Sequence, residues 1–309
     1  MVGILRSYIV GVSIGIFLIS CEGSRKKTPA TEKSDKKIKT IMESIHDPVE
    51  NAGTLENQST LSEGSSMIKF AFAQQGALLA KSTFDSNGNL VGRITYKYTV
   101  AGDTLETATY SFSETLLSKW VNEFDSQHKL TKSKEIDASG KIIGKRIVER
   151  AGDDTLRVST YGQLRGELVK LMESYLDGNN RSIRNSFFTN GKTICEVRII
   201  YDDKENKIET DQFYPFKKAR IITQYKFDQL NNNIEKIILN NNLMITSKMA
   251  MRYDEKNNII EILTYGIAGR LEKRLHYTYQ YDEFANWTKR VAFENNKPAE
   301  VTLHRIAYY

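Results

Sequence analysis

The chain has 309 residues, 40% of them hydrophobic and 27% charged, with a net charge of +6. Arg6 contributes +1 and residues 22–39 contribute +4, which leaves only +1 for residues 40–309. A nearly neutral remainder lacks the electrostatic footprint of a protein that binds nucleic-acid backbones, so we expect no nucleic-acid partner.

The first 21 residues have the features of an export signal. Arg6 precedes an apolar run over residues 8–19, and the run closes with Leu18-Ile19-Ser20-Cys21. A positive start followed by a short apolar run is typical of secretory signals, whereas a spanning helix needs about 20 apolar residues. The alternative is an uncleaved N-terminal membrane helix in which the cysteine occurs by chance.

This N-terminus resembles bacterial lipoprotein signals, whose lipobox is an apolar, a variable and a small residue followed by cysteine. The resemblance implies a signal peptide over residues 1–20, a diacylglycerol thioether on Cys21 and acylation, for instance by palmitate, of the new amine. Two or three acyl chains hold a protein on a membrane, because each buried methylene contributes about 0.8 kcal/mol. Glu22 in place of Asp favours the outer over the inner membrane of the cell envelope, and the leaflet stays open.

The second cysteine, Cys195, is then left without a partner for a disulfide. It alternates with Val197 and Ile199, which predicts a small buried hydrophobic residue on a strand. A reactive thiol is the alternative, but no neighbouring motif supplies an activating base.

Residues 21–66 are predicted to form the lipidated N-terminus and a disordered tether. The segment is rich in Lys, Glu, Ser, Thr and Asn and has almost no aromatic residues, so it buries too little apolar surface to offset the entropy of ordering. A short helix over residues 38–45 is the alternative. The basic residues of 22–39 fit either a solvated linker or contact with anionic headgroups, which adds about 1 kcal/mol per cation.

From residue 67 to residue 309 the hydrophobic period becomes two. Ile94, Tyr96 and Tyr98 alternate with polar residues, as do the aromatic residues of 275–281. Side chains two apart share one face of a strand, so we predict an all-β domain over residues 67–309. Residues 164–176 fit a helical stripe or a strand, and the turn-like residues 177–180 favour the strand.

A unit recurs in this domain: an aromatic or apolar residue, Asp, a short polar turn and another apolar residue. Asp202, Asp228, Asp254 and Asp282 are 26, 26 and 28 residues apart. The aspartate accepts N–H groups of the turn, and Asn or Gly takes the left-handed position. Each unit is a hairpin that cannot bury its face alone, so the copies must stack. The other copies are Phe84-Asp85, Phe124-Asp125 and Ile136-Asp137.

The segment Tyr279-Gln280-Tyr281-Asp282 with Asn286-Trp287 resembles the Y-x-Y-D-x-x-G-N-W form of YD-repeat (RHS-like) proteins, with Ala285 in place of Gly. It is most similar to secreted lipoproteins of unknown role that carry degenerate YD-like repeats. Large members wind such repeats into a shell. This chain holds too few copies to close one, so an open, elongated and twisted antiparallel sheet of stacked β-hairpins is implied. Its last strand, near residues 301–309, would offer a free edge to a partner strand.

No metal or cofactor site is expected. Asp85-Ser86-Asn87-Gly88-Asn89 starts like a calcium loop, but Leu90 and Tyr96 stand where such a loop needs Gly and Glu. The four histidines have no metal-ligand spacing, and nucleotide-binding fingerprints are missing from the sequence.

Exposed aromatic residues are the candidate binding surface, either for sugar rings or for peptides, and packing between repeats is the alternative. The candidates are Trp120, Tyr277, Tyr279, Tyr281 and Trp287. The leading expectation is a non-catalytic binding or scaffold module at the membrane surface with a protein or glycan partner. A glycan-binding accessory lipoprotein and an enzyme with a site assembled across strands are the alternatives.

Overall fold

The computed structural model describes residues 36–46, 66–152, 154–161 and 168–309, and these fold into twenty strands of one sheet. The first ten strands are β1 (Ile38–His46), β2 (Met67–Phe72), β3 (Leu78–Phe84), β4 (Leu90–Tyr98), β5 (Thr104–Tyr110), β6 (Leu116–Phe124), β7 (Leu130–Asp137), β8 (Ile142–Arg150), β9 (Thr155–Tyr161) and β10 (Leu168–Leu176). The remaining strands are β11 (Ser182–Thr189), β12 (Lys192–Tyr201), β13 (Lys207–Tyr214), β14 (Ala219–Phe227), β15 (Asn233–Leu239), β16 (Ile245–Tyr253), β17 (Ile259–Tyr265), β18 (Leu271–Tyr281), β19 (Trp287–Glu294) and β20 (Lys297–Tyr308). Two short 3-10 helices, η1 (Pro215–Lys217) and η2 (Ile267–Gly269), form hairpin turns.

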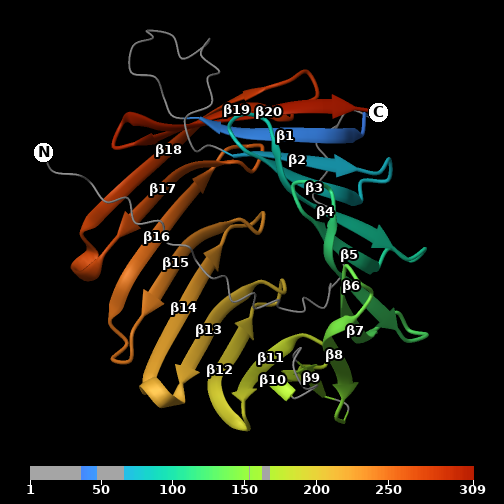
Figure 1. Ribbon diagram of the computed structural model, residues 1–309. Coiled ribbons are helices and arrows are strands. Elements are labelled where there is room, and N and C mark those ends of the chain that lie inside the picture. Colours follow the sequence, from blue (N-terminus) through green and yellow to red (C-terminus); the bar gives the residue numbers. More distant parts are fainter. Residues whose placement is uncertain (1–35, 47–65, 153, 162–167) are drawn as a thin grey trace, which may run out of the picture.

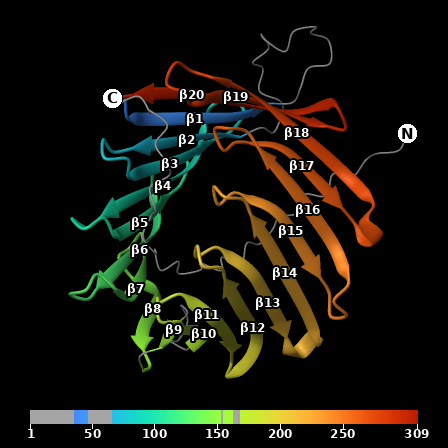
Figure 2. The ribbon, with the colours of Figure 1, turned by 180° about the vertical axis from the view of Figure 1, so that it is seen from behind.

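Each strand pairs antiparallel with the next one along the chain, and the sheet closes on itself. The closing strand is β1, which pairs with β2 from Ser44↔Met67 to Thr40↔Ala71 and with β20 from His46↔Val301 to Ile38↔Tyr308. Figures 1 and 2 show β1 between β20 and β2, with the other strands arranged in a ring. The predicted all-β class and antiparallel pairing are confirmed.

Three expectations about the ends of the sheet were wrong. The sheet is closed rather than open, and the strand near residues 301–309 has no free edge because β19 and β1 flank it. Residues 38–46, expected in a disordered tether or a short helix, form β1 instead. The physical reason is that this segment is hydrogen-bonded on both sides, by β2 and by β20, which stabilises a strand whose apolar residues do not alternate. The rest of the tether and the signal peptide lie outside the described residues.

The turns at one end of the strands follow the predicted 26-residue period along the whole domain. These turns, which we call the first rim, begin at residues 73, 99, 125, 151, 177, 202, 228, 254 and 282. The second rim, at the other end of the strands, comprises the turns that begin at residues 85, 111, 137, 215, 240 and 266 and the short turns 190–191 and 295–296. The structural repeat is therefore a hairpin with one turn at each rim. The strand predicted within residues 164–176 is present as β10.

The corner aspartates take the predicted role in the turns. In the turn 254–258, Asp254 Oδ1 accepts the N–H groups of Lys256 at 2.9 Å and Asn258 at 2.8 Å. Asn257 has a positive φ of 63°, the left-handed conformation that Asn tolerates. The left-handed position is not confined to Asn and Gly, however, because His128, Glu205, Leu243 and Ala285 also occupy it in other turns.

Few side chains of the described residues are fully buried, and they lie on both faces of the sheet. The buried apolar residues are Ala108, Val158, Leu176, Phe187, Ile199, Ile222, Val291, Ala292 and Val301. A closed sheet of this many strands encloses more space than its inward-facing side chains can fill. These side chains alone therefore do not form a dry core. The sheet is a single layer, stabilised by ladder hydrogen bonds and by side-chain pairs between neighbouring strands.

Candidate binding surfaces of the sheet

One face of the sheet carries a repeated triplet of charges, and we call it the ion-pair face. Glu235 on β15 lies between Lys226 on β14 and Lys248 on β16, each at 2.6 Å. Glu106 is bridged by Lys97 and Lys119 at 2.8 and 3.0 Å, and Glu261 by Arg252 and Arg274 at 3.2 and 2.8 Å. In all three triplets the cation, the glutamate and the second cation are 9 and 13 residues apart.

The triplets keep their carboxylates ionised. Hydrogen bonds from Lys226 and Lys248 hold the pKa of Glu235 below its usual value. Hydrogen bonds from Lys97 and Lys119 have the same effect on the pKa of Glu106. A general acid needs the opposite shift, a raised carboxyl pKa. These glutamates are therefore suited to holding neighbouring strands together through ion pairs.

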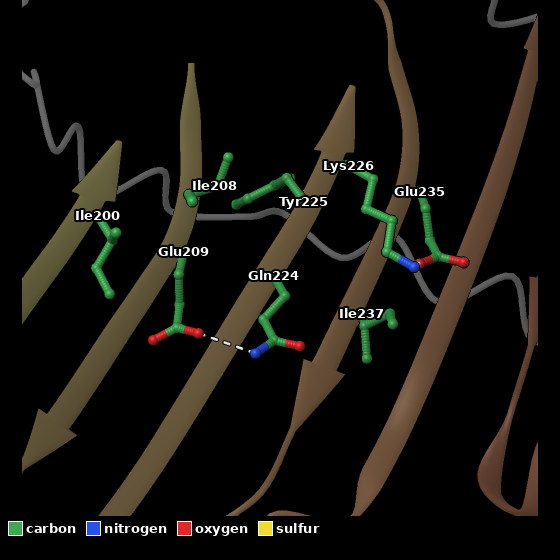
Figure 3. A pocket seen from close by; sticks show the side chains of 8 residues that line it. All are labelled: Ile200, Ile208, Glu209, Gln224, Tyr225, Lys226, Glu235 and Ile237. Carbon is green, nitrogen blue, oxygen red and sulfur yellow. Dashed lines mark hydrogen bonds and ion pairs between the residues drawn. The ribbon is translucent and has the colours of Figure 1, made fainter. Parts of the chain in front are cut away.

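A pocket of about 240 Å³ lies beside one triplet, where β12 to β15 meet. Its lining residues are Ile200, Ile208, Glu209, Gln224, Tyr225, Lys226, Glu235 and Ile237. Figure 3 shows Glu209 joined to Gln224, whose side-chain amide nitrogen Nε2 donates to Glu209 Oε2 at 2.9 Å. Lys226 and Glu235 lie side by side at the other end of the pocket. The pocket thus offers apolar surface flanked by groups that are already paired.

Four of the five candidate aromatic residues come together near the closing strand. Tyr277, Tyr279 and Tyr281 lie on β18, and Trp287 begins β19. Tyr279 meets Trp287 edge-on with ring centroids 6.1 Å apart, and His304 of β20 stacks on Trp287 at 3.5 Å. These rings therefore pack against one another and against neighbouring strands.

The same cluster is tied to β1. His304 Nε2 lies 2.9 Å from Glu43 Oε2, and Arg290 lies over the ring of Trp287 at 5.7 Å. A hydrogen bond between His304 and Glu43 and a ring stack thus connect β19, β20 and the closing strand.

Trp120 is separate from this cluster. It lies on β6, five strands away from β1, and Arg146 covers its ring at 5.0 Å. Its Cη2 reaches toward Gly144, where a Cβ atom would lie only 3.7 Å away. The structure does not join Trp120 with the other candidates into one strip.

From β12 to β20, hydrogen bonds along the first rim join each hairpin to the next. Asn206 Nδ2 donates to Asn231 Oδ1, and Asn232 Nδ2 donates to Asn257 Oδ1, both at 3.1 Å. The Tyr281 hydroxyl then donates to Asp254 Oδ2 at 2.9 Å, and Tyr308 makes the equivalent bond to Asp282. The tyrosines and asparagines of the repeat thus lock consecutive hairpins together.

The remaining expectations concern metals and thiols. Within the part of the chain that the structure describes, no group of three or more His, Cys, Asp or Glu side chains is placed to hold a metal ion. Asp85 Oδ1 accepts the N–H groups of Asn87 and Asn89 at 2.9 and 2.8 Å, as a turn residue does. Cys195 is half-buried on β12, and burial raises the pKa of its thiol, which lowers its reactivity. None of the helices among the described residues has the length and apolarity needed to cross a membrane.

The charge triplets and the exposed turn tips were not anticipated from the sequence. A signal for the triplets does exist, because Lys226-Glu235-Lys248 and Arg252-Glu261-Arg274 repeat the same spacing one 26-residue period apart. Reading it requires knowing that opposite and diagonal positions on neighbouring strands lie 9 and 13 residues apart in this hairpin repeat.

No family model matches the chain. No curated protein matches it either. Among solved structures, TcdB2-TccC3 is 12% identical with a TM-score of 0.37, and the match covers 78% of this chain and 15% of that one. The Tc holotoxin pore of Photorhabdus luminescens is 10% identical with a TM-score of 0.29, over 77% of this chain and 19% of that one. A porin-like protein from Bacteroides uniformis is 10% identical with a TM-score of 0.33, over 87% of this chain and 96% of that one. The chain thus spans less than a fifth of the toxin chains that it matches.

Proposed function

We propose that this chain is a lipid-anchored protein of the bacterial cell envelope that acts as a non-catalytic binding or scaffold module. The observation that carries the non-catalytic role is the charge compensation of the ion-pair face. Glu106, Glu235 and Glu261 each lie between two cations, so their charges are used to hold neighbouring strands.

The anchor is supported by the sequence Leu18-Ile19-Ser20-Cys21 after a short apolar run. Lipid on Cys21 holds the protein at a membrane surface, and Glu22 favours the outer membrane. The described sheet begins with β1 at Ile38, so the tether between lipid and sheet comprises residues 22–37 rather than 22–66.

The partner is a protein or a glycan. The pocket between β12 and β15 offers a ligand the apolar surface of Ile200 and Ile237 beside the hydrogen-bonded pair of Gln224 and Glu209. A glycan-binding accessory role is the second candidate, and this pocket supports it better than the aromatic cluster, whose rings pack on one another.

Metabolic labelling with palmitate tests the anchor. The wild-type protein is expected to incorporate label and to sediment with membranes, while Cys21→Ala is expected to lose the label. Cys195→Ala is the matched control and should be labelled like the wild type. A wild-type protein without label would contradict the anchor.

A further inference from the structure

The second rim exposes apolar side chains at the tips of three neighbouring hairpins. Phe216 lies in the turn between β13 and β14, Leu243 and Met244 in the turn between β15 and β16, and Ile267 in the turn between β17 and β18. Their exposed fractions are 67%, 62%, 57% and 74%. Figure 1 shows η1 and η2, which hold Phe216 and Ile267, on the same side of the ring.

These apolar tips are not required by the turns that carry them. The turn 254–258 has the same backbone as 240–244, and there Asn257 takes the left-handed position while Asn258 Nδ2 bonds to Asp254. The turn 240–244 has Leu243 with a φ of 60° and Met244 at the equivalent positions. A leucine disfavours this conformation, and exposed methionine forms no such bond, so the local fold gives no reason for either residue.

The tips are held in a fixed arrangement. Asn241 Nδ2 donates to the carbonyl oxygen of Lys218 at 2.8 Å, and Asn241 Oδ1 accepts the N–H of Arg220. These bonds join the turn of Phe216 to the turn of Leu243. Consecutive hairpins are two strand spacings, about 10 Å, apart along the rim. The three hairpins therefore present an apolar row rather than isolated side chains.

Charge separates this rim from the opposite one. The turns 215–218, 240–244 and 266–270 contain three cations and no acidic residue, and the Glu272 carboxylate of β18 lies against Gly266, which leaves this end at +2. At the other end of the same strands, the turns 202–206, 228–232, 254–258 and 282–286 contain eight acidic residues against two lysines, a net charge of −6. Lys36 and Lys37 also lie at that end, which changes its net charge to −4. The three cations are Lys217, Lys218 and Arg270.

We propose that the second rim over β13–β18 docks on an anionic lipid surface, an inference that rests on the proposed anchor. Apolar tips beside cations match the boundary between anionic headgroups and acyl chains, where such side chains lie about 5–10 Å deep. Anionic headgroups attract the three cations and repel the first rim.

The tether allows this orientation. The described chain starts at Lys36, beside the first rim. The segment from Cys21 to Lys36 spans up to about 50 Å when extended, whereas a nine-residue strand is about 30 Å long. Lipid on Cys21 can therefore reach the membrane plane on which the second rim rests.

Footprinting of the lipidated protein in vesicles tests the inference. The protein is reconstituted in phosphatidylcholine vesicles with and without phosphatidylglycerol, and oxidation of Met244, Phe216 and Ile267 is followed by mass spectrometry. Phosphatidylglycerol is expected to slow their oxidation several-fold. Val100 and Leu230, exposed at the first rim, should stay as reactive as in detergent solution.

A pair of variants sharpens the test. Leu243→Asn with Met244→Asn gives this turn the residues of the turn 254–258, so the fold should be retained while protection of Phe216 and Ile267 falls. Val100→Asn with Leu230→Asn is the matched control at the first rim and should leave that protection unchanged.

Three results would overturn the docking. The first is equal reactivity of the tips with and without phosphatidylglycerol, and the second is protection of the first rim instead of the second. The third is protection that grows with protein concentration in detergent, which would show that the second rim binds a second copy of the chain. The N-terminal peptide mass separates the two proposals. An unlipidated Cys21 contradicts the anchor, whereas a lipidated protein with reactive tips contradicts the docking alone.

Discussion

Tyr281 and Tyr308 each connect two hairpins of the first rim through one hydroxyl. Tyr281 donates to Asp254 and accepts from Asn258 Nδ2 at 2.8 Å. Burial and the hydrogen bond to Asp254 raise the pKa of Tyr281 to about 12. Burial and the bond to Asp282 likewise raise the pKa of Tyr308 to about 12.

Removing the hydroxyl of Tyr281 should weaken the link between hairpins. We expect Tyr281→Phe to lower the free energy of unfolding by about 1.5–3 kcal/mol, the net contribution of one hydrogen bond to a charged group. Urea denaturation measures the change. Tyr265→Phe is the control, because the hydroxyl of Tyr265 makes no hydrogen bond among the described residues. Equal losses in both variants would contradict the role of the hydroxyl.

The raised tyrosine pKa values make stability depend on alkaline pH. The pKa of each tyrosine is about 12 in the folded protein against 10.0 ordinarily. The unfolded chain therefore loses these protons first, and the stabilisation present below pH 10 is lost as pH rises toward about 12. Urea midpoints at about pH 9 and about pH 11 should show this decline. Tyr281→Phe with Tyr308→Phe should make the decline shallower, because other tyrosines with raised pKa values, such as Tyr279, contribute the rest. An unchanged decline would refute the assignment.

At the scale of the element, β1 closes the ring. It forms antiparallel ladders with β20 on one side and β2 on the other, and Ile41 lies opposite Ile306 and Phe70. A strand with neighbours on both sides cannot be removed without exposing two edges.

A proline in β1 should open this seam. Ile41→Pro removes one ladder donor and the backbone freedom that a central strand requires. Hydrogen exchange is expected to quicken at residues 68–71 and 301–307, while β12–β15, on the far side of the ring, keep their protection. Ile41→Val is the control and should exchange like the wild type. Unchanged exchange beside the proline would show that β1 is dispensable.

The strands and the corner aspartates were predictable from the sequence, because alternation and turn chemistry act over a few residues. The turns at Thr99 and Gly266 were not predicted, because they have the same backbone hydrogen bonds as the aspartate turns but do not begin with an aspartate. Strand β1 was not predicted, because Ile41 and Met42 place apolar side chains on both faces and its sequence therefore does not alternate. Its neighbours, which lie at least 20 residues or the whole domain away, decide its conformation.

At the scale of the whole molecule, closure depends on quantities that the sequence does not display. The number of hairpins that closes a ring is set by strand tilt and stagger, and both emerge only when all strands are paired. The predicted aromatic surface illustrates the same limit. Tyr279 and Trp287 meet because β18 and β19 are neighbours, but Trp120 on β6 lies eight strands from β18 by the shorter way around the closed sheet.

Closure also gives the molecule two unlike ends. Over β12–β19 the first rim collects the acidic corners of the repeat, and the second rim collects Phe216, Leu243 and Ile267 with their neighbouring cations. An open sheet would have a long unpaired edge strand to which another chain could bind. The closed sheet has no such edge, so its two rims are the surfaces available for binding.

A cross-strand disulfide tests closure most directly. Met42 lies opposite Arg305 in the β1–β20 register, and directly opposed Cα atoms lie at about 4.5–5.5 Å, within disulfide range. In a Cys195→Ser background, Met42→Cys with Arg305→Cys is predicted to form an intramolecular disulfide under mild oxidation. Met42→Cys with Leu303→Cys, two residues out of register, should not. Failure of the first pair, or equal cross-linking of both pairs, would contradict the closed sheet.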